Sequence, residues 1–381
     1  MTDAEWIPLA VPTLEGNEAA YLQECIDTNF VSSVGPFVDR FEQAFAAYVG
    51  VEFAIACASG TAAIHIAMRL LGVSAGDDVL VPTLTFIASA NPIVYERATP
   101  VFVDAEPETM NLDPAIVVDE LAKRARLGRR QPAAIEVVHL LGHPADVTPI
   151  LEASARYGVP VVEDASEALG ATYVSGPSAG RQVGAVGQIG CFSFNGNKII
   201  TAGGGGMITT DDPALARRAR HLTTQARLPG RTYRHDEVGY NYRLTNLAAA
   251  VGLAQLERLP TLLVARRKNA AAYDRAIAQL DGIEPAARAP WADPSFWLYT
   301  ARLDAGPQDE VLDHLEASGI EARPVWSPLH RMAPFLGAPL LGGSVAESMS
   351  ARAFCLPSSS NLRPHDLGRI SRALREAIES R

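Results

Sequence analysis

The chain has 381 residues, of which 48% are hydrophobic and 20% charged, so it has room for a large core and a second domain. Its formal net charge of −10 argues against general binding to nucleic acids or to anionic membrane surfaces. The four cysteines lie far apart without C-x-x-C spacing, which predicts no metal site and no disulfide framework and fits a reducing cytoplasm.

Strands and helices alternate over the first two-thirds of the chain. Short apolar runs predict buried parallel strands at 53–57, 79–82, 100–104, 133–141 and 159–164. Between them, helical spacing of apolar residues predicts helices at 61–72, 114–125 and 147–158. This alternation predicts an α/β domain with helices on both faces of its sheet, and ligands of such domains bind at the carboxyl ends of the strands.

The last third of the chain has a different pattern. A helical stretch over 244–280 is interrupted at Pro260. The elements expected after it are a strand at 297–303 and helices at 308–317 and 365–379. These elements predict a smaller α+β domain.

We therefore expect a large domain over residues 1–250, and a connecting helix with a small domain over residues 251–381. The N-terminus does not resemble a secretory leader, and no apolar stretch is expected to be long enough to span a membrane.

Asp164 is the first candidate for chemistry, because it ends the apolar strand VPVVED. A carboxylate at this edge of the sheet can face a ligand. The alternative is a helix N-cap, with Glu167 three residues later as the partner of a capping box.

Two further features follow strand ends. Ser59, Gly60 and Thr61 stand between a strand and a helix, where free backbone N–H groups can bind an anion. Phe86 follows the strand at 79–82 and could cover a flat ring, although a lone phenylalanine more often packs in a core. Neither a P-loop nor a Rossmann glycine fingerprint is present, which argues against a dehydrogenase.

Lys198 lies in the small and apolar segment IGCFSFNGNKIITAGGGGM. Burial lowers the pKa of a lysine, and the neutral amine can form a Schiff base with an aldehyde. A buried amine, a carboxylate, an anion site and an aromatic face together match the needs of pyridoxal 5′-phosphate (PLP). The four glycines at 203–206 allow a tight bend beside a cofactor, or simply a flexible turn.

These features occur within motifs that resemble the sugar-aminotransferase family of the DegT/DnrJ/EryC type, which are fold-type I PLP enzymes. The matching motifs are SGTAA (59–63), VPTLTF (81–86), VHLLGHPADV (138–147), EDASEALGA (163–171), CFSFNGNKIITAGGGGM (191–207) and GYNYRLTN (239–246). The resemblance implies a large domain with a mostly parallel seven-stranded sheet flanked by helices, and a smaller α+β C-terminal domain.

The resemblance also implies catalytic roles. Lys198 would hold PLP and move the proton, and Asp164 would pair with the pyridine nitrogen. Glu167 would bond the ring 3-oxygen, although many relatives have Gln at this position, so its charge is a departure from the family pattern. Relatives that dehydrate sugars have His in place of the lysine, so Lys198 favours transamination.

Further contacts are implied for the cofactor and the substrate. The remaining cofactor contacts are Gly60, Thr61 and Ser193 at the phosphate, Phe86 and Ser166 on the two ring faces, and Asn241 from the partner subunit of a homodimer. The contacts of the sugar nucleotide are Ser32, Ser33, His139 and His330. A satisfied core histidine is the alternative for His139.

The motifs look most like those of the aminotransferases of bacillosamine and legionaminic acid synthesis. We therefore expect L-glutamate as the amino donor and UDP-2-acetamido-2,6-dideoxy-4-keto-hexose as the acceptor. GDP-4-keto-6-deoxymannose (perosamine-type), a dTDP-keto sugar or a 3-keto sugar is the alternative substrate. A PLP-binding regulator without turnover is the alternative that is not an enzyme.

Overall fold

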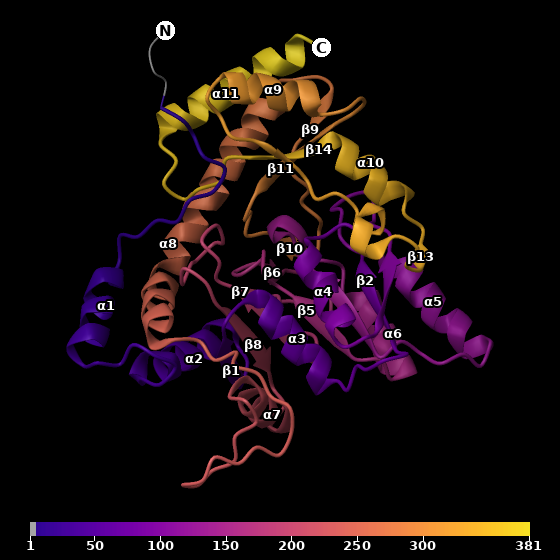
Figure 1. Cartoon of the computed structure of the whole chain (residues 1–381). Helices are drawn as coiled ribbons and strands as arrows, with labels where there is room; N and C mark the ends of the chain where they lie inside the picture. The colour runs from indigo at the N-terminus through magenta and orange to yellow at the C-terminus, as the bar shows by residue number, and fades with distance from the viewer. Residues whose placement is uncertain (1–4) are drawn as a thin grey trace.

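The computed structural model describes residues 5–381, and its largest element is an eight-stranded sheet (Figure 1). In spatial order its strands are β1 (Phe53–Cys57), β8 (Gly206–Thr210), β7 (Ile189–Ser193), β5 (Val161–Asp164), β4 (Ala134–Val138), β2 (Asp78–Pro82), β3 (Thr99–Val103) and β13 (Leu340–Leu341). Only β8 runs against the others. The strands are apolar almost throughout because helices cover both faces.

The strand count differs from the expected seven. Seven strands come from the first 210 residues, and β13 adds an eighth beside β3. The short strand β13 belongs to the C-terminal part of the chain, where the sequence carries no strand-length apolar run. This segment is therefore a strand because it pairs with β3, which is distant in the sequence.

Two helical layers enclose the large sheet. One face is covered by α3 (Gly60–Leu70), α4 (Ile87–Tyr95) and α7 (Pro213–Thr223). The other face is covered by α2 (Pro36–Val49), α5 (Pro114–Arg126), α6 (Thr148–Tyr157) and the first half of α8 (Asn246–Ile277). The expected strands and helices of this domain are confirmed, with ends shifted by at most three residues.

Helix α8 differs from the expectation in two ways. It is continuous through Pro260, whose side chain is exposed, so the predicted interruption is wrong. It is also long and apolar enough to span a membrane, whereas no stretch of that kind was expected. However, 56% of its most apolar window is buried, and it packs against α1 (Glu18–Asp27), α2 and α11 (Pro364–Glu379), as a core helix does.

The second half of α8 supports a small domain with its own core. Its antiparallel sheet has the order β12 (Arg323–Pro324), β14 (Ala353–Leu356), β11 (Tyr299–Leu303) and β9 (Ile283–Glu284). Helices α9 (Asp309–Ala317) and α11 pack together beside it, and α10 (Ser344–Arg352) precedes β14. The predicted domain boundary between residues 250 and 251 falls inside α8. The division of the chain into two domains at this point stays a prediction.

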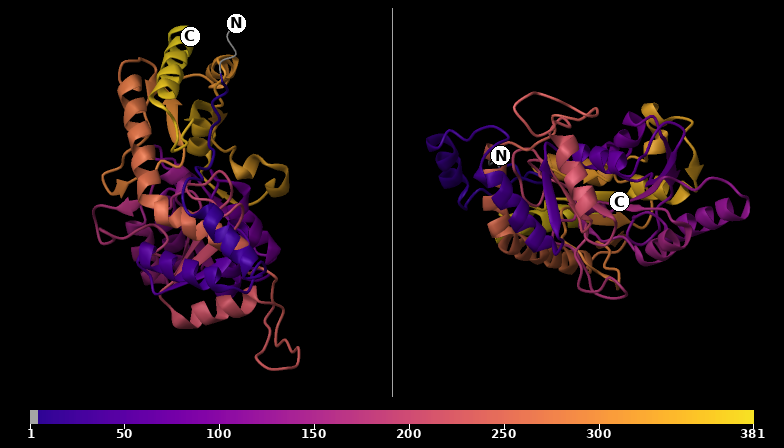
Figure 2. Two further views of the ribbon diagram at one scale, coloured as in Figure 1. Left: turned by 90° about the vertical axis from the view of Figure 1, so that its left-hand side faces the viewer. Right: turned by 90° about the horizontal axis from the view of Figure 1, so that it is seen from below.

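The other short elements connect these layers. They are the strand pair β6 (Thr172–Tyr173) and β10 (Ala292–Asp293), and the 3₁₀ turns Leu140–Gly142, Leu329–Arg331 and Ala333–Phe335. Residues 224–243, here called the projecting segment, join α7 to α8. Their two ends pack on the large domain, and the loop between those ends stands away from the body of the molecule (Figure 2). Tyr233, with 79% of its surface exposed, lies on this segment.

Candidate active site

A cavity of about 320 Å³ opens at the carboxyl ends of β5 and β7, beside the N-terminus of α3. Eight of the residues that the sequence predicts for the site line it: Gly60, Thr61, Phe86, Asp164, Ser166, Glu167, Ser193 and Lys198. They come from four separate stretches of the chain, and the sheet brings them to one edge. The location is the one expected for a ligand of a parallel α/β sheet.

Asp164 is the last residue of β5 and is buried. Its Oδ2 accepts a hydrogen bond from Ser89 Oγ at 2.8 Å, and its Oδ1 accepts one from the Ser166 N–H at 3.1 Å. No helix begins here, so the N-cap and capping-box alternative is wrong. The two donors orient the carboxylate.

Lys198 lies between β7 and β8, and its side chain is 14% exposed. Its Nζ is 3.8 Å from Glu167 Oε1 and 3.7 Å from the centroid of the Trp297 ring. Burial lowers the pKa of this amine, and the nearby carboxylates of Glu167 and Asp164 oppose that effect only in part. The lowered pKa increases the fraction of neutral, nucleophilic amine.

The N-terminus of α3 forms one wall of the cavity. Ser59 Oγ accepts a hydrogen bond from the Ala62 N–H at 3.0 Å, so Ser59 caps the helix. The N–H groups of Gly60 and Thr61 precede the first helical hydrogen bond and remain available to an anion. A Cβ on Gly60 would lie 2.8 Å from Ser193 Cβ and 3.1 Å from Ser166 Oγ, so glycine leaves this space open.

Aromatic rings form the opposite wall. Phe86 is half-exposed, and its ring centroid is 5.2 Å from that of Trp326. Trp326 stacks on Trp297 at 6.4 Å. Phe86 is therefore not a core residue, and it can cover one face of a flat ligand. Ser166 lines the cavity near Gly60, and its contact with a ring face stays a prediction.

Glu167 is buried beside Lys198. Its Oε2 accepts a hydrogen bond from the Leu141 N–H at 2.7 Å. Burial raises the pKa of this carboxyl, and Lys198 and the Leu141 N–H partly offset the rise. The residue lines the cavity at the lysine, and the predicted bond to a ring oxygen stays a prediction.

The glycine run also lies at the cavity. Gly204 and Gly205 line it, and Gly203 and Gly205 have positive φ angles of 77° and 139°. A Cβ on Gly206 would lie 2.4 Å from the carbonyl oxygen of Ser59. The close-bend interpretation of residues 203–206 therefore describes the structure better than a free flexible turn.

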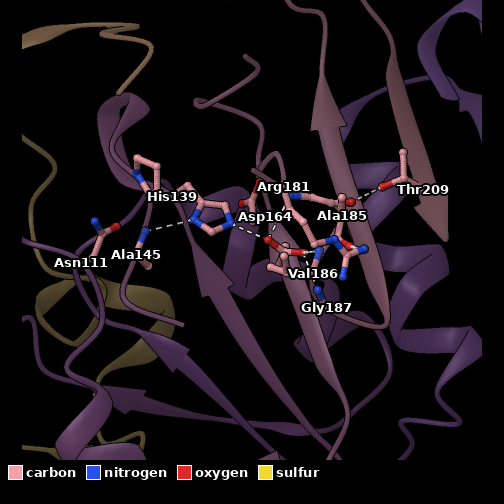
Figure 3. Close-up of polar contacts among 12 residues, drawn as sticks. Asn111, His139, Ala145, Asp164, Arg181, Ala185, Val186, Gly187 and Thr209 are labelled. Atoms are coloured by element: carbon pink, nitrogen blue, oxygen red, sulfur yellow. Dashed lines mark hydrogen bonds and ion pairs between the residues drawn. The ribbon is translucent and has the colours of Figure 1, made fainter. Parts of the chain in front are cut away.

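His139 does not line the cavity and is fully buried. Figure 3 shows its ring with polar contacts on both sides, one of them to Ala145. Its Nδ1 accepts from the Ala145 N–H at 3.1 Å, so Nε2 carries the proton and donates to Glu163 at 2.9 Å. Glu163 also accepts from the N–H groups of three residues of the loop before β7: Gly184, Val186 and Gly187. These contacts match the core-histidine alternative.

The other predicted contacts of the substrate and the partner lie outside this cavity. Ser32 offers its carbonyl to the Asn246 N–H at 2.6 Å, and Ser33 follows it before α2. His330 bonds Thr83 Oγ1 at 2.7 Å and Glu347 at 2.9 Å. Asn241 is exposed on the projecting segment. Their roles stay predictions.

Several lining residues were missed by the sequence analysis. These are Ser89, Asn195, Asn197, Trp297 and Trp326. Ser89 lies one turn after Phe86, but nothing in the sequence shows that it faces Asp164. The two tryptophans come from the small domain, more than 95 residues after Lys198. No local signal could have placed them there.

A larger cavity of about 600 Å³ lies between segment 140–143 and the small domain. The two arginines among its lining residues are already paired, Arg288 with Asp274 and Arg302 with Glu284. Its other walls are mainly apolar and contain no lysine. The smaller cavity therefore has the chemistry of an active site.

The comparisons with known proteins agree with this geometry. The model of the DegT/DnrJ/EryC1/StrS aminotransferase family matches residues 12–375. The chain belongs to this family. It is 44% identical to a GDP-perosamine synthase of Caulobacter vibrioides, over 99% of this chain and 100% of that one. It is 37% identical to a GDP-perosamine synthase of Escherichia coli O157:H7, over 98% of each chain.

A similar solved structure supports the fold. DesV of S. venezuelae superimposes with a TM-score of 0.86 at 34% identity, over 95% of this chain and 94% of that one. The protein is thus a fold-type I PLP-dependent enzyme that aminates nucleotide sugars.

The comparisons do not support the narrower expectation. The motifs pointed to the bacillosamine and legionaminic acid enzymes, whereas the similar relatives named above are GDP-perosamine synthases. The quoted motifs surround the cofactor, which family members share. They therefore carry little information about the nucleotide or the sugar.

The cavity of this family member fits PLP. The α3 N-terminus and Ser193 can bind the phosphate, in the space that the missing Cβ of Gly60 leaves open. Asp164 is a buried, oriented carboxylate that can pair with the pyridine nitrogen. Lys198 has an amine that can bind the aldehyde.

Proposed function

We propose that the protein transfers an amino group from L-glutamate to C4 of GDP-4-keto-6-deoxymannose. The product is a GDP-linked 4-amino-4,6-dideoxy sugar. The observation that carries the choice of substrate is the similarity to two GDP-perosamine synthases over nearly the whole of each chain. We place the reaction in the cytoplasm, where a reducing environment suits four free cysteines.

Lys198 and Asp164 carry the chemistry of this proposal. PLP, when bound, supplies an aldehyde for Schiff-base formation and a ring that accepts electrons. Lys198 binds that aldehyde, and its freed amine moves a proton to and from the substrate carbon. Asp164 holds a proton at the pyridine nitrogen, because Ser89 and Ser166 keep its carboxylate oriented toward the cavity.

The remaining walls bind and orient. The α3 N–H groups hold the phosphate, and Phe86 covers one ring face and excludes water from it. Lys198 is the only cationic side chain among the residues that line the cavity. The several negative charges of a nucleotide sugar and of glutamate need further donors.

We propose that a second copy of the chain supplies those donors from its projecting segment. The loop of this segment stands off the body, and the segment carries exposed Asn241 together with Arg227, Arg231 and Arg234. A homodimer with shared sites would place these groups at the partner's cavity. Sedimentation velocity should then give the mass of two chains.

The substrate is tested by a half-reaction with the purified holoenzyme. L-Glutamate should remove the visible absorbance of the bound cofactor, and GDP-4-keto-6-deoxymannose should restore it after glutamate is washed out. Recovery with the UDP-linked or dTDP-linked keto sugar instead would overturn the choice of nucleotide. Absorbance that glutamate never removes would favour a PLP-binding regulator without turnover.

Shared sites are tested by mixing two inactive variants. In a heterodimer of Lys198→Ala and Asn241→Ala chains, one site has both defects and the other has neither. Random mixing should therefore restore about a quarter of the wild-type sites. No recovery, from inactive variants shown to exchange subunits, would mean that Asn241 serves the site of its own chain.

A further inference from the structure

Two groups lie close to the amine of Lys198. Glu167 Oε1 lies 3.8 Å from Nζ, and the centroid of the Trp297 ring lies 3.7 Å from it. A carboxylate attracts an ammonium group, and so does the face of an indole ring. The free amine therefore has a defined position at which its charged form is stabilised.

Both groups are fixed by other parts of the protein. Glu167 Oε2 accepts the Leu141 N–H at 2.7 Å, and Leu141 has an unusual positive φ of 56°. Trp297 Nε1–H donates to the carbonyl of Asn197 at 2.6 Å, and its ring stacks on Trp326. The position for the amine is thus built before the amine is released from a cofactor.

The proton affinities of the amine and the carboxyl are shifted toward each other. Burial lowers the pKa of Lys198, and burial raises the pKa of Glu167. The other ionisable groups near the pair are Asp164, whose charge acts on both, and the buried thiol of Cys355. In such a pair, one proton can reside on either partner.

We propose that Glu167 exchanges a proton with Lys198 whenever the amine is free of the cofactor, and that Trp297 holds the amine in place for this exchange. In the forward step the amine moves from 3.8 Å to within hydrogen-bond distance of Oε1. An N–H bond of the ammonium then breaks and an O–H bond forms at Oε1, leaving a neutral amine and a neutral carboxylic acid. The reverse step restores the ion pair, and no other reactant is needed. This role rests on the proposed function of Lys198 and goes beyond a bond from Glu167 to the ring 3-oxygen.

The neutral amine is the form that can remove a proton from a substrate carbon. Glu167 would generate it within the cavity, so that the proton need not pass to the solvent. A glutamine at this position could bond the ring but could not hold the proton. Glu at residue 167, in place of Gln, therefore adds a group that can accept the proton of Lys198 and return it.

The first test is a titration of Lys198 in the full chain stripped of PLP. The chain has only three lysines, so acetic anhydride labelling at Lys123, Lys198 and Lys268 can be followed separately by peptide mass. Glu167→Gln should lower the midpoint pH for labelling of Lys198 by about one unit or more, because the nearby negative charge is lost. Trp297→Leu should lower it less, and Trp297→Phe should retain most of the wild-type value.

Lys123 and Lys268 are exposed and act as internal controls, so their midpoints should not move. An unchanged or raised midpoint at Lys198 in Glu167→Gln would overturn the proposal. Borohydride reduction of the wild-type holoenzyme tests the underlying function separately. If PLP mass is not found on Lys198, the role of the lysine itself fails.

The second test separates proton exchange from a static ion pair. In the half-reaction with L-glutamate, Glu167→Gln should slow proton transfer by about 10-fold to 100-fold and leave the glutamate dissociation constant near its wild-type value. Glu167→Asp, which keeps an acid, should recover part of the rate. An unchanged rate in Glu167→Gln would make Glu167 only a counter-ion and overturn the exchange.

Discussion

Replacing Glu136 with Gln should stabilise the protein, and the gain should grow as the pH rises. Glu136 lies in the middle of β4, is 0% exposed, and neither of its carboxyl oxygens has a hydrogen-bond partner among the described residues. Burial raises its pKa well above the ordinary value of 4.5, and the charge of Asp164 adds to the rise. The folded protein therefore keeps a proton that the unfolded chain loses.

The size of the effect follows from this difference in proton binding. Below pH 4.5 both states hold the proton, and Glu136 imposes no pH-dependent cost. Above pH 4.5, each pH unit over which the folded state keeps the proton lowers the free energy of unfolding by about 1.4 kcal/mol. Gln has the same shape and no ionisation, so Glu136→Gln removes this loss.

The assay is urea unfolding of wild type and variant at intervals from pH 4.5 to pH 8. The difference in unfolding free energy should be small at pH 4.5 and should increase with pH at close to that slope. A flat difference over the series would refute the reasoning, because it would mean that Glu136 ionises as readily in the fold as in the unfolded chain.

Glu163 in the adjacent strand β5 is the matched control. It is equally buried, but His139 and the backbone N–H groups of Gly184 and Gly187 outweigh the effect of burial and lower its pKa. Its contribution to stability is present above pH 4.5 and is lost as the pH falls through the lowered value. Glu163→Gln should therefore destabilise by roughly 3 kcal/mol at neutral pH, with a loss that shrinks in acid.

Three further substitutions test other features. Gly60→Ala should weaken PLP binding by at least about 10-fold in equilibrium dialysis, because the new Cβ would meet Ser193 Cβ at 2.8 Å; wild-type affinity would contradict the phosphate assignment. Ser89→Ala removes the hydroxyl that donates to Asp164 at 2.8 Å and should lower kcat about 10-fold. The absorbance of the bound cofactor should show that PLP remains in the site. Pro260→Ala should raise the free energy of unfolding by about 1–3 kcal/mol, because alanine restores a backbone N–H within α8. A lower thermal midpoint in the variant would contradict this, because it would show that the native helix already accommodates the proline.

The sequence was informative wherever function follows a strand end. Asp164, Thr61 and Lys198 could be found because apolar runs predict strands and the ends of parallel strands lie on one edge of a sheet. Ser89 could not be found, because its contact with Asp164 depends on how α4 is rotated. Trp297 and Trp326 depend on how the small domain packs on the large one, which no local pattern encodes.

The same limit explains the errors. Pro260 has the local signature of a helix break, but packing of α8 on three other helices outweighs it. Glu167 has the spacing of a capping box, but the chain after β5 forms turns that bring its carboxyl to Lys198. Shared cofactor motifs could not identify the nucleotide, because they describe the part of the site that relatives have in common.

The pairing of β13 with β3 has a consequence for how the protein is made. β3 would otherwise be the edge of the large sheet, and Leu341 covers it by accepting a hydrogen bond from the Asp104 N–H at 2.9 Å. A ribosome synthesises β3 more than 230 residues before it synthesises β13. Until then the nascent chain exposes an apolar strand edge that can pair with another chain, so chaperone demand and aggregation during expression should be highest for chains that stop before residue 340.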